Sequence, residues 1–112
     1  MDIIEETRGG VTIVKPAGRI DSATSATFET RLVEAVVGRG KASVVVDMTQ
    51  LTYISSAGLR ALLVAAKKAK PAGSRVVLAA MAPTIREVFD MSGFSALFEI
   101  HAAPDDAVAA LS

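Results

Sequence analysis

Two adjacent serines, Ser55 and Ser56, offer the most specific chemistry in this sequence. They stand just ahead of an apolar helical stripe, where a serine commonly accepts a hydrogen bond from the first free amides of the helix. The same helix end carries a partial positive charge and unpaired N–H groups, which favour a phosphate. The pair therefore fits either a helix cap or a phosphorylation site, and a phosphate on Ser56 would add about −1.5 to −2 charges at neutral pH.

Signs of catalysis are weak in the rest of the chain. The single histidine, His101, is far in sequence from both serines, although a general base must lie within hydrogen-bond reach of its nucleophile. Residues 54–58 half match the G-x-S-x-G turn of serine hydrolases, because Ile54 stands where the first glycine belongs. The sequence has no cysteine and no glycine-rich phosphate loop of either common pattern. We therefore expect no enzymatic activity, no metal site and no cofactor.

Alternating strands and helices are predicted to position the serines. Short β-branched runs predict strands over residues 3–7, 11–17, 42–48, 75–80 and 97–101, with a Gly9-Gly10 turn joining the first two into a hairpin. Apolar residues at helical spacing predict helices between Asp21 and Gly38, over residues 56–69, between Pro83 and Gly93, and over residues 105–111. This ββαβαβαβα order predicts an α/β fold: a mixed, mostly parallel sheet with an antiparallel edge hairpin, flanked by helices. Residues 42–48 are its expected central strand.

Length and composition predict one domain over residues 1–112 with one hydrophobic core. The chain has 112 residues, 51% of them hydrophobic and 21% charged, which suits a single folded unit. We expect the core to include Val44, Val45, Val46, Leu59, Leu62, Leu63, Val77, Ile85, Val88 and Phe89.

Charge and hydropathy exclude several classes of partner. Twelve basic and twelve acidic side chains cancel, so the chain lacks the excess positive charge that attracts nucleic acid or an anionic membrane. Its apolar runs are far shorter than the roughly 18 residues of a membrane span. Acidic residues occupy the N-terminal stretch where a signal peptide would carry basic ones. We expect a cytoplasmic protein that binds neither nucleic acid nor membrane.

The side of the second helix opposite its leucine stripe is expected to face solvent. Helical spacing places four residues outward: Ala61, Val64, Ala65 and Lys68. It places Arg60 and Lys67 on the flank below Ser56. This small, weakly polar face fits a docking surface, although alanine also fills exposed positions simply because it is the best helix former.

Three segments of the sequence resemble the STAS domain, as found in bacterial anti-sigma-factor antagonists. Residues 47–59 resemble the strand-loop-helix signature of that family. Gly18-Arg19-Ile20-Asp21 resembles its strand-to-helix junction, and residues 88–94 resemble its characteristic helix ending. The segments follow one another in the family's order and span nearly the whole chain.

The resemblance implies a partner switch. The unphosphorylated domain would bind a cognate serine-protein kinase that is also an anti-sigma factor, phosphorylation would end that binding, and a PP2C-type phosphatase would restore it. In the family motif the acceptor serine lies two residues before a glycine, which corresponds here to Ser56 and Gly58. Ser55 stands where the family often has aspartate, so modification of Ser55 instead stays open, and Arg60 replaces a frequent glycine. The expected partner-binding residues are Asp21, Ser55, Ser56, Gly58, Arg60, Ala61, Val64 and Lys68.

Two other functions stay open at this point. The chain could be a STAS adaptor that is never phosphorylated and acts as a fixed subunit of a transport or sensory complex, or a small hydrolase that uses Ser56. The oligomeric state, monomer or weak dimer, is also open. Neighbouring genes for a histidine-kinase-like ATPase and a PP2C phosphatase would favour the switch, and genes for transporter subunits would favour the adaptor.

Overall fold

The computed structural model describes residues 2–38 and 43–111. Its elements in chain order are β1 (Asp2–Arg8), β2 (Val11–Ile20), α1 (Ser25–Val37), β3 (Val44–Asp47), β4 (Leu51–Ile54), α2 (Ser56–Ala69), β5 (Val76–Ala79), α3 (Pro83–Ser92), the 3-10 helix η1 (Phe94–Leu97), β6 (Glu99–His101) and α4 (Pro104–Leu111). The ends of the predicted domain, Met1 and Ser112, and the first residue of the predicted central strand, Ala42, lie outside the described residues.

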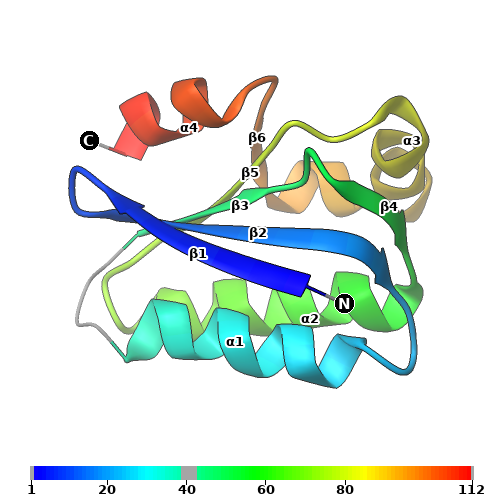
Figure 1. Ribbon diagram of the computed structural model, residues 1–112, viewed down its shortest axis with the longest axis horizontal. Helices are drawn as coiled ribbons and strands as arrows, with labels where there is room; N and C mark the ends of the chain where they lie inside the picture. The colour runs from blue at the N-terminus through cyan, green and yellow to red at the C-terminus, as the bar shows by residue number, and fades with distance from the viewer. Residues whose placement is uncertain (1, 39–42, 112) are drawn as a thin grey trace.

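A single mixed sheet forms the middle layer, in the order β1-β2-β3-β5-β6. Among the described strands, β1 and β2 pair antiparallel through the Gly9-Gly10 turn, and the other pairs are parallel. Helices α1 and α2 lie side by side under the sheet, α4 covers the opposite face, and α3 stands at one end (Figure 1). The structure confirms the predicted fold class and the central position of the strand that contains Val44.

Strand β4 is absent from the predicted order, which is therefore one strand short. Only its two end residues, Leu51 and Ile54, are buried. The four residues therefore lack the alternation of buried and exposed positions that predicts a strand. Tertiary pairing makes this segment a strand: the last residues of β2 leave β3 and pair with β4 instead. A bulge between Gly18 and Arg19 interrupts the pairing of β2 with β4, and the positive φ of Gly18, 93°, suits that bend.

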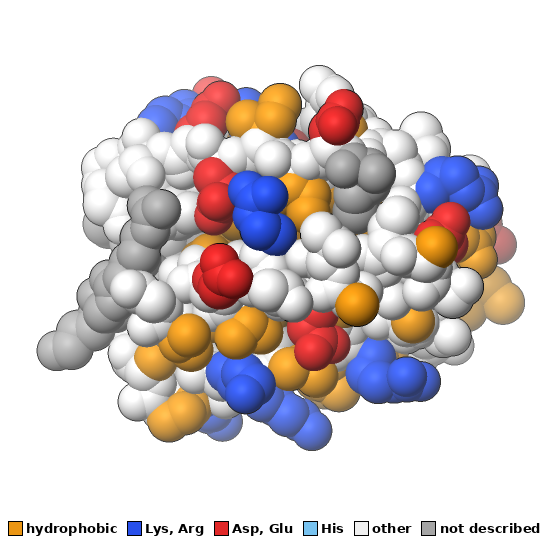
Figure 2. Space-filling model, turned by 60° about the horizontal axis from the view of Figure 1, so that its bottom comes forward, with side chains coloured by type: hydrophobic (Ala, Val, Ile, Leu, Met, Phe, Trp, Pro, Cys, Tyr) orange, Lys and Arg blue, Asp and Glu red, His pale blue; other side chains and the backbone are white. Residues whose placement is uncertain are grey.

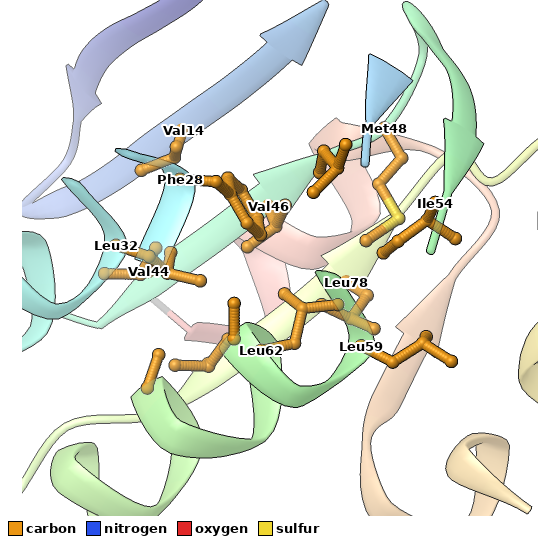
Figure 3. Close-up of a cluster of buried hydrophobic side chains, with 14 of the residues drawn as sticks. Val14, Phe28, Leu32, Val44, Val46, Met48, Ile54, Leu59, Leu62 and Leu78 are labelled. Carbon is orange, nitrogen blue, oxygen red and sulfur yellow. The ribbon is translucent and has the colours of Figure 1, made fainter. Parts of the chain in front are cut away.

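The main core lies between the sheet and the helices α1 and α2 (Figure 3). Side chains from β2, α1, β3, β4, α2, β5 and α3 meet there, among them Phe28 and Leu62, together with Met48, which directly follows β3. A second, smaller cluster lies on the other face of the sheet, where Ala107 of α4 packs against β2, β3 and β5. Among the described residues, no helix combines the length and the apolar character needed to cross a bilayer.

Eight of the ten expected core residues are buried, and two are not: Val88 is 37% exposed and Leu63 is half-buried. On α3, Ile85 and Phe89 lie four residues apart and take the inner face. Val88 is therefore left on the outer side of a helix that has few neighbours. Leu63 lies on the flank of α2, where it lines a surface groove.

Candidate functional site

The ends of β2 and β4 bring Asp21 and Ser55 next to each other. Ile20 and Ile54 are direct partners in the parallel pairing of these strands. One residue further, the Ser55 N–H donates to the Ile20 carbonyl oxygen at 2.8 Å. The site is therefore built at the carboxyl ends of parallel strands, where α/β folds commonly place ligand and partner contacts.

Gly58 lets the start of α2 approach these strand ends closely. A Cβ atom at this position would lie 2.7 Å from Ile20 Cγ2 and 2.7 Å from Ile54 Cγ1. Both isoleucines are almost fully buried, so neither has free space to move into. The position requires glycine because of this close packing, and the packing fixes the first turn of α2 against β2 and β4.

Ser55 is the N-cap of α2, as its place in the sequence indicated. Its backbone is extended, with φ −87° and ψ 171°, and its Oγ accepts a hydrogen bond from the Gly58 N–H at 3.2 Å. Its carbonyl accepts from the Leu59 N–H at 3.0 Å. The Ser55 hydroxyl oxygen is thus engaged in holding the helix end.

Ser56 is the first residue of α2 and is exposed. Among the described residues, no group forms a hydrogen bond with its hydroxyl. The first turn of α2 contains no acidic residue, so the partial positive charge of the helix end is not neutralised from within. The Ser56 oxygen therefore faces solvent in a setting that favours an added anion.

Asp21 organises the loop that leads from β2 into α1. Its Oδ1 accepts from the Ala23 N–H at 3.0 Å and from the Thr24 N–H at 3.1 Å. Desolvation raises the pKa of this carboxyl, but the hydrogen bonds from Ala23 and Thr24, helped by the positive charge of Arg19, outweigh it and lower the pKa below its ordinary value. Asp21 is therefore a carboxylate at neutral pH, and it stands beside the start of α2 as a fixed negative charge.

The solvent face of α2 differs from the expected one. Ala61 and Ala65 are buried, at 1% and 0% exposure, because α1 packs along that side of α2. Gly58 is buried as well, against the two strand ends. The expectation that Ala61 and Ala65 face solvent was therefore wrong, whereas the expected partner contacts of Gly58 and Ala61 stay a prediction.

The exposed line of α2 runs through Ser56, Arg60, Val64 and Lys68, which follow one another at intervals of four residues. Arg60 and Lys68 are exposed and Val64 is half-buried. Within the described part of the chain, Arg60 and Lys68 form no ion pair. The helical side of the molecule carries basic, acidic and apolar side chains close together (Figure 2).

Arg19 and Tyr53 extend this surface onto the strands. They are cross-strand partners in the β2–β4 pairing, and the Arg19 guanidinium carbon lies 4.2 Å from the centre of the Tyr53 ring. Tyr53 is 40% exposed. The sequence does not indicate that these two residues are surface neighbours, because β4 is not predicted and no local pattern links them.

His101 takes no part in this site. Its Nε2 lies 2.6 Å from Oε2 of Glu99, within the edge strand β6. Strands β3 and β5 separate β6 from β2. Among the described residues, no hydrogen bond joins His101 to Ser56.

Comparison with known proteins identifies the family. Residues 2–107 match the model of the STAS domain. BtrV of Bordetella bronchiseptica, a candidate anti-sigma factor antagonist, is 39% identical over 101 residues, which cover 90% of this chain and 86% of BtrV. The anti-sigma F factor antagonist of Paenibacillus polymyxa is 30% identical over 112 residues, covering 100% of this chain and 93% of that protein.

Solved structures show the same fold. The anti-sigma factor antagonist SpoIIAA in its unphosphorylated form superposes with a TM-score of 0.81 at 18% identity, over 96% of this chain and 93% of SpoIIAA. The phosphorylated form of SpoIIAA from Bacillus gives 0.75 at 17% identity, over 99% and 100%. Its relatives by sequence carry the name of anti-sigma factor antagonists, and the chain belongs to the STAS domain family.

Proposed function

We propose that this protein is an anti-sigma factor antagonist that acts by partner switching. Its unphosphorylated form binds a cognate serine-protein kinase that is also an anti-sigma factor, and phosphorylation of Ser56 ends that binding. A PP2C-type phosphatase then removes the phosphate and restores the binding form. In this role the protein is a cytoplasmic, non-enzymatic, single-domain binding module, and it works without a cofactor.

The exposure of Ser56 at the start of α2 carries the proposal. Its hydroxyl is accessible and has no hydrogen-bond partner among the described residues, whereas the Ser55 oxygen is half-buried and holds the Gly58 N–H. A kinase that modified Ser55 would have to break the helix cap first. These two environments favour Ser56 as the acceptor.

A docking face around Ser56 would explain how one phosphate controls binding. We assign to it Asp21, Ser55, Ser56, Arg60, Val64 and Lys68, which all lie at the start or along the exposed line of α2 or on the adjoining loop. Gly58 supports this face from inside by seating α2 on Ile20 and Ile54. A partner that covered the face would bury Ser56.

Phosphorylation should weaken docking without unfolding the domain. A phosphate brings about two negative charges, and burying it against a partner costs several kcal/mol unless cationic donors match it. In the free domain the same group would be satisfied locally, by the N–H groups of the first turn and by Arg60 one turn further along the helix. The free form therefore tolerates the phosphate, whereas the complex is destabilised by it.

The proposal is tested by incubating the protein with ATP and the kinase that is encoded beside its gene. The phosphate is then located by mass spectrometry. Ser56→Ala should fold, bind the kinase and resist phosphorylation. Ser56→Asp should fold normally and bind the kinase more than about 100-fold more weakly, which corresponds to roughly 2.7 kcal/mol. Ser55→Ala is the matched control, because it should lose stability and still accept phosphate on Ser56.

Two results would contradict parts of this proposal. A phosphate found on Ser55 would refute the acceptor assignment and keep the switch. Tight kinase binding by Ser56→Asp, or no phosphate with the neighbouring kinase, would refute the switch and favour a STAS adaptor that is never modified.

A further inference from the structure

A groove lies at the opposite end of α2 from Ser56, and the docking face does not include it. It has a volume of about 360 Å³ and runs between the C-terminal half of α2, the start of β5 and the segment from η1 into β6. Leu63 and Ala66 of α2 form one wall, Leu97 and Phe98 form the other, and Val76 lies between them. Leu97 is 57% exposed and Phe98 is half-buried, so apolar surface faces water here.

Cationic side chains border one end of this groove. Lys67 and Lys70 line it and are exposed, and in residues 2–38 and 43–111 neither forms an ion pair. The other two charged residues of the lining, Arg75 and Glu99, pair with each other and cancel. The groove therefore has a net charge of about +2 from the two lysines.

The groove changes from apolar to cationic along α2. Leu63 and Lys67 lie four residues apart on one side of the helix, as do Ala66 and Lys70, so each apolar side chain has a lysine one turn closer to the C-terminus. The helix C-terminus itself carries partial negative charge, so the lysines must supply the attraction for an anion. A ligand that matches this gradient has an apolar chain and an anionic head.

We propose that this groove binds a medium-chain fatty acid, with its carboxylate between Lys67 and Lys70 and its chain against Leu63, Leu97 and Phe98. The volume is at the small end of the range of ligand sites, about 300–1,000 Å³, which suits one acyl chain better than a nucleotide cofactor. Lys67 lies about 16 Å from Ser56 along the helix axis, by the helical rise of 1.5 Å per residue. Binding here is therefore independent of the Ser56 switch.

Titration of the isotope-labelled protein with decanoate below its micelle concentration tests this site, by calorimetry and by amide chemical shifts. We expect saturable binding with shifts confined to α2 after Leu63, to the start of β5 and to residues 94–99. Decanol, which has the same chain without the charge, and octanoate, which is two methylenes shorter, should both bind more weakly. For octanoate the loss is up to about fourfold for each methylene removed.

Three variants separate the contributions of charge and shape. Lys67→Gln with Lys70→Gln alters two exposed side chains and should weaken decanoate binding by about tenfold. Lys68→Gln is the matched control, because Lys68 is adjacent in sequence but does not line the groove, and it should leave decanoate binding unchanged. Ala66→Leu should narrow the groove and weaken binding, and Ser56→Asp should have no effect on it.

Several outcomes would overturn the inference. Decanoate that fails to saturate the protein, or that binds the Lys67→Gln, Lys70→Gln variant as tightly as the unaltered chain, would refute the site. Shifts centred on Ser56 would place the ligand on the docking face instead. Binding of an acidic leucine-rich peptide or of phosphatidylglycerol vesicles, with no response to decanoate, would replace the fatty acid by a protein segment or a membrane surface.

Discussion

Replacement of Gly58 by alanine tests whether α2 is held in close contact with β2 and β4. In an ordinary helix position, a glycine-to-alanine change stabilises by up to about 1 kcal/mol. Here the added Cβ would lie 2.7 Å from carbon atoms of Ile20 and Ile54, and overpacking of a filled core costs about 1–3 kcal/mol. With the full helix-propensity gain set against the clash, the net effect is a loss of up to about 2 kcal/mol, so a clear gain in stability would be inconsistent with it.

Urea unfolding of Gly58→Ala, followed by circular dichroism, measures this loss directly. Ala57→Gly is the matched control, because Ala57 lies in the same turn and is partly exposed. Its cost, about 1 kcal/mol or less, reports helix propensity at this turn without the clash. A Gly58→Ala protein that is more stable than the unaltered chain would refute the close approach. The same contact fixes the position of Ser56. We therefore also expect folded Gly58→Ala to bind the kinase more weakly than the unaltered chain, beyond the effect of the unfolded fraction.

Four further substitutions probe the core, the cap and the acid response. Leu62→Ala should lower the free energy of unfolding by about 2–5 kcal/mol, since Leu62 is fully buried, whereas Leu63→Ala on the half-buried flank should cost clearly less; equal losses would contradict the burial pattern. Ser55→Ala should cost about 1 kcal/mol through loss of the cap to Gly58, and unchanged stability would mean that the cap contributes nothing. The hydrogen bond with His101 and the charge of Arg75 lower the pKa of Glu99, so its contribution to stability is present above the ordinary glutamate pKa and is lost as the pH falls through the lowered value. Below about pH 4.3, the free energy of unfolding of Glu99→Gln should therefore depend less on pH than that of the unaltered chain. An equal dependence on pH in the two proteins would contradict this.

Local patterns in the sequence predicted most of the elements. The Gly9-Gly10 turn, Pro83 at the first position of α3 and Gly93 at its end, with φ 80°, all mark element boundaries where the structure has them. Val44 to Val46 form a run with no polar position, and that run is the covered central strand. In each case the signal is a backbone requirement or a burial pattern carried by the residues themselves.

Features that depend on a neighbour were not predictable in this way. Ala61 and Ala65 fit an exposed or a buried helix face equally well, and the position of α1 decides between them. Strand β4 forms because β2 is long enough to pair with a second strand. The part of the site carried by Ser55 and Ser56 was visible from their place ahead of the helix, but its alignment with Asp21 and Tyr53 depends on that unpredicted pairing.

The two ends of the sheet bear on how this protein avoids aggregation. A chain with no net charge and 51% hydrophobic residues has little electrostatic repulsion between copies, so an open strand edge is its main risk of self-association. β1, at one edge, carries Asp2, Glu5, Glu6 and Arg8 along a largely exposed strand, and β6, at the other, is three residues long. Charge at one border and shortness at the other keep further strands from adding to the sheet. Substitutions intended to make β1 more hydrophobic would therefore reduce solubility before they reduced the stability of the fold.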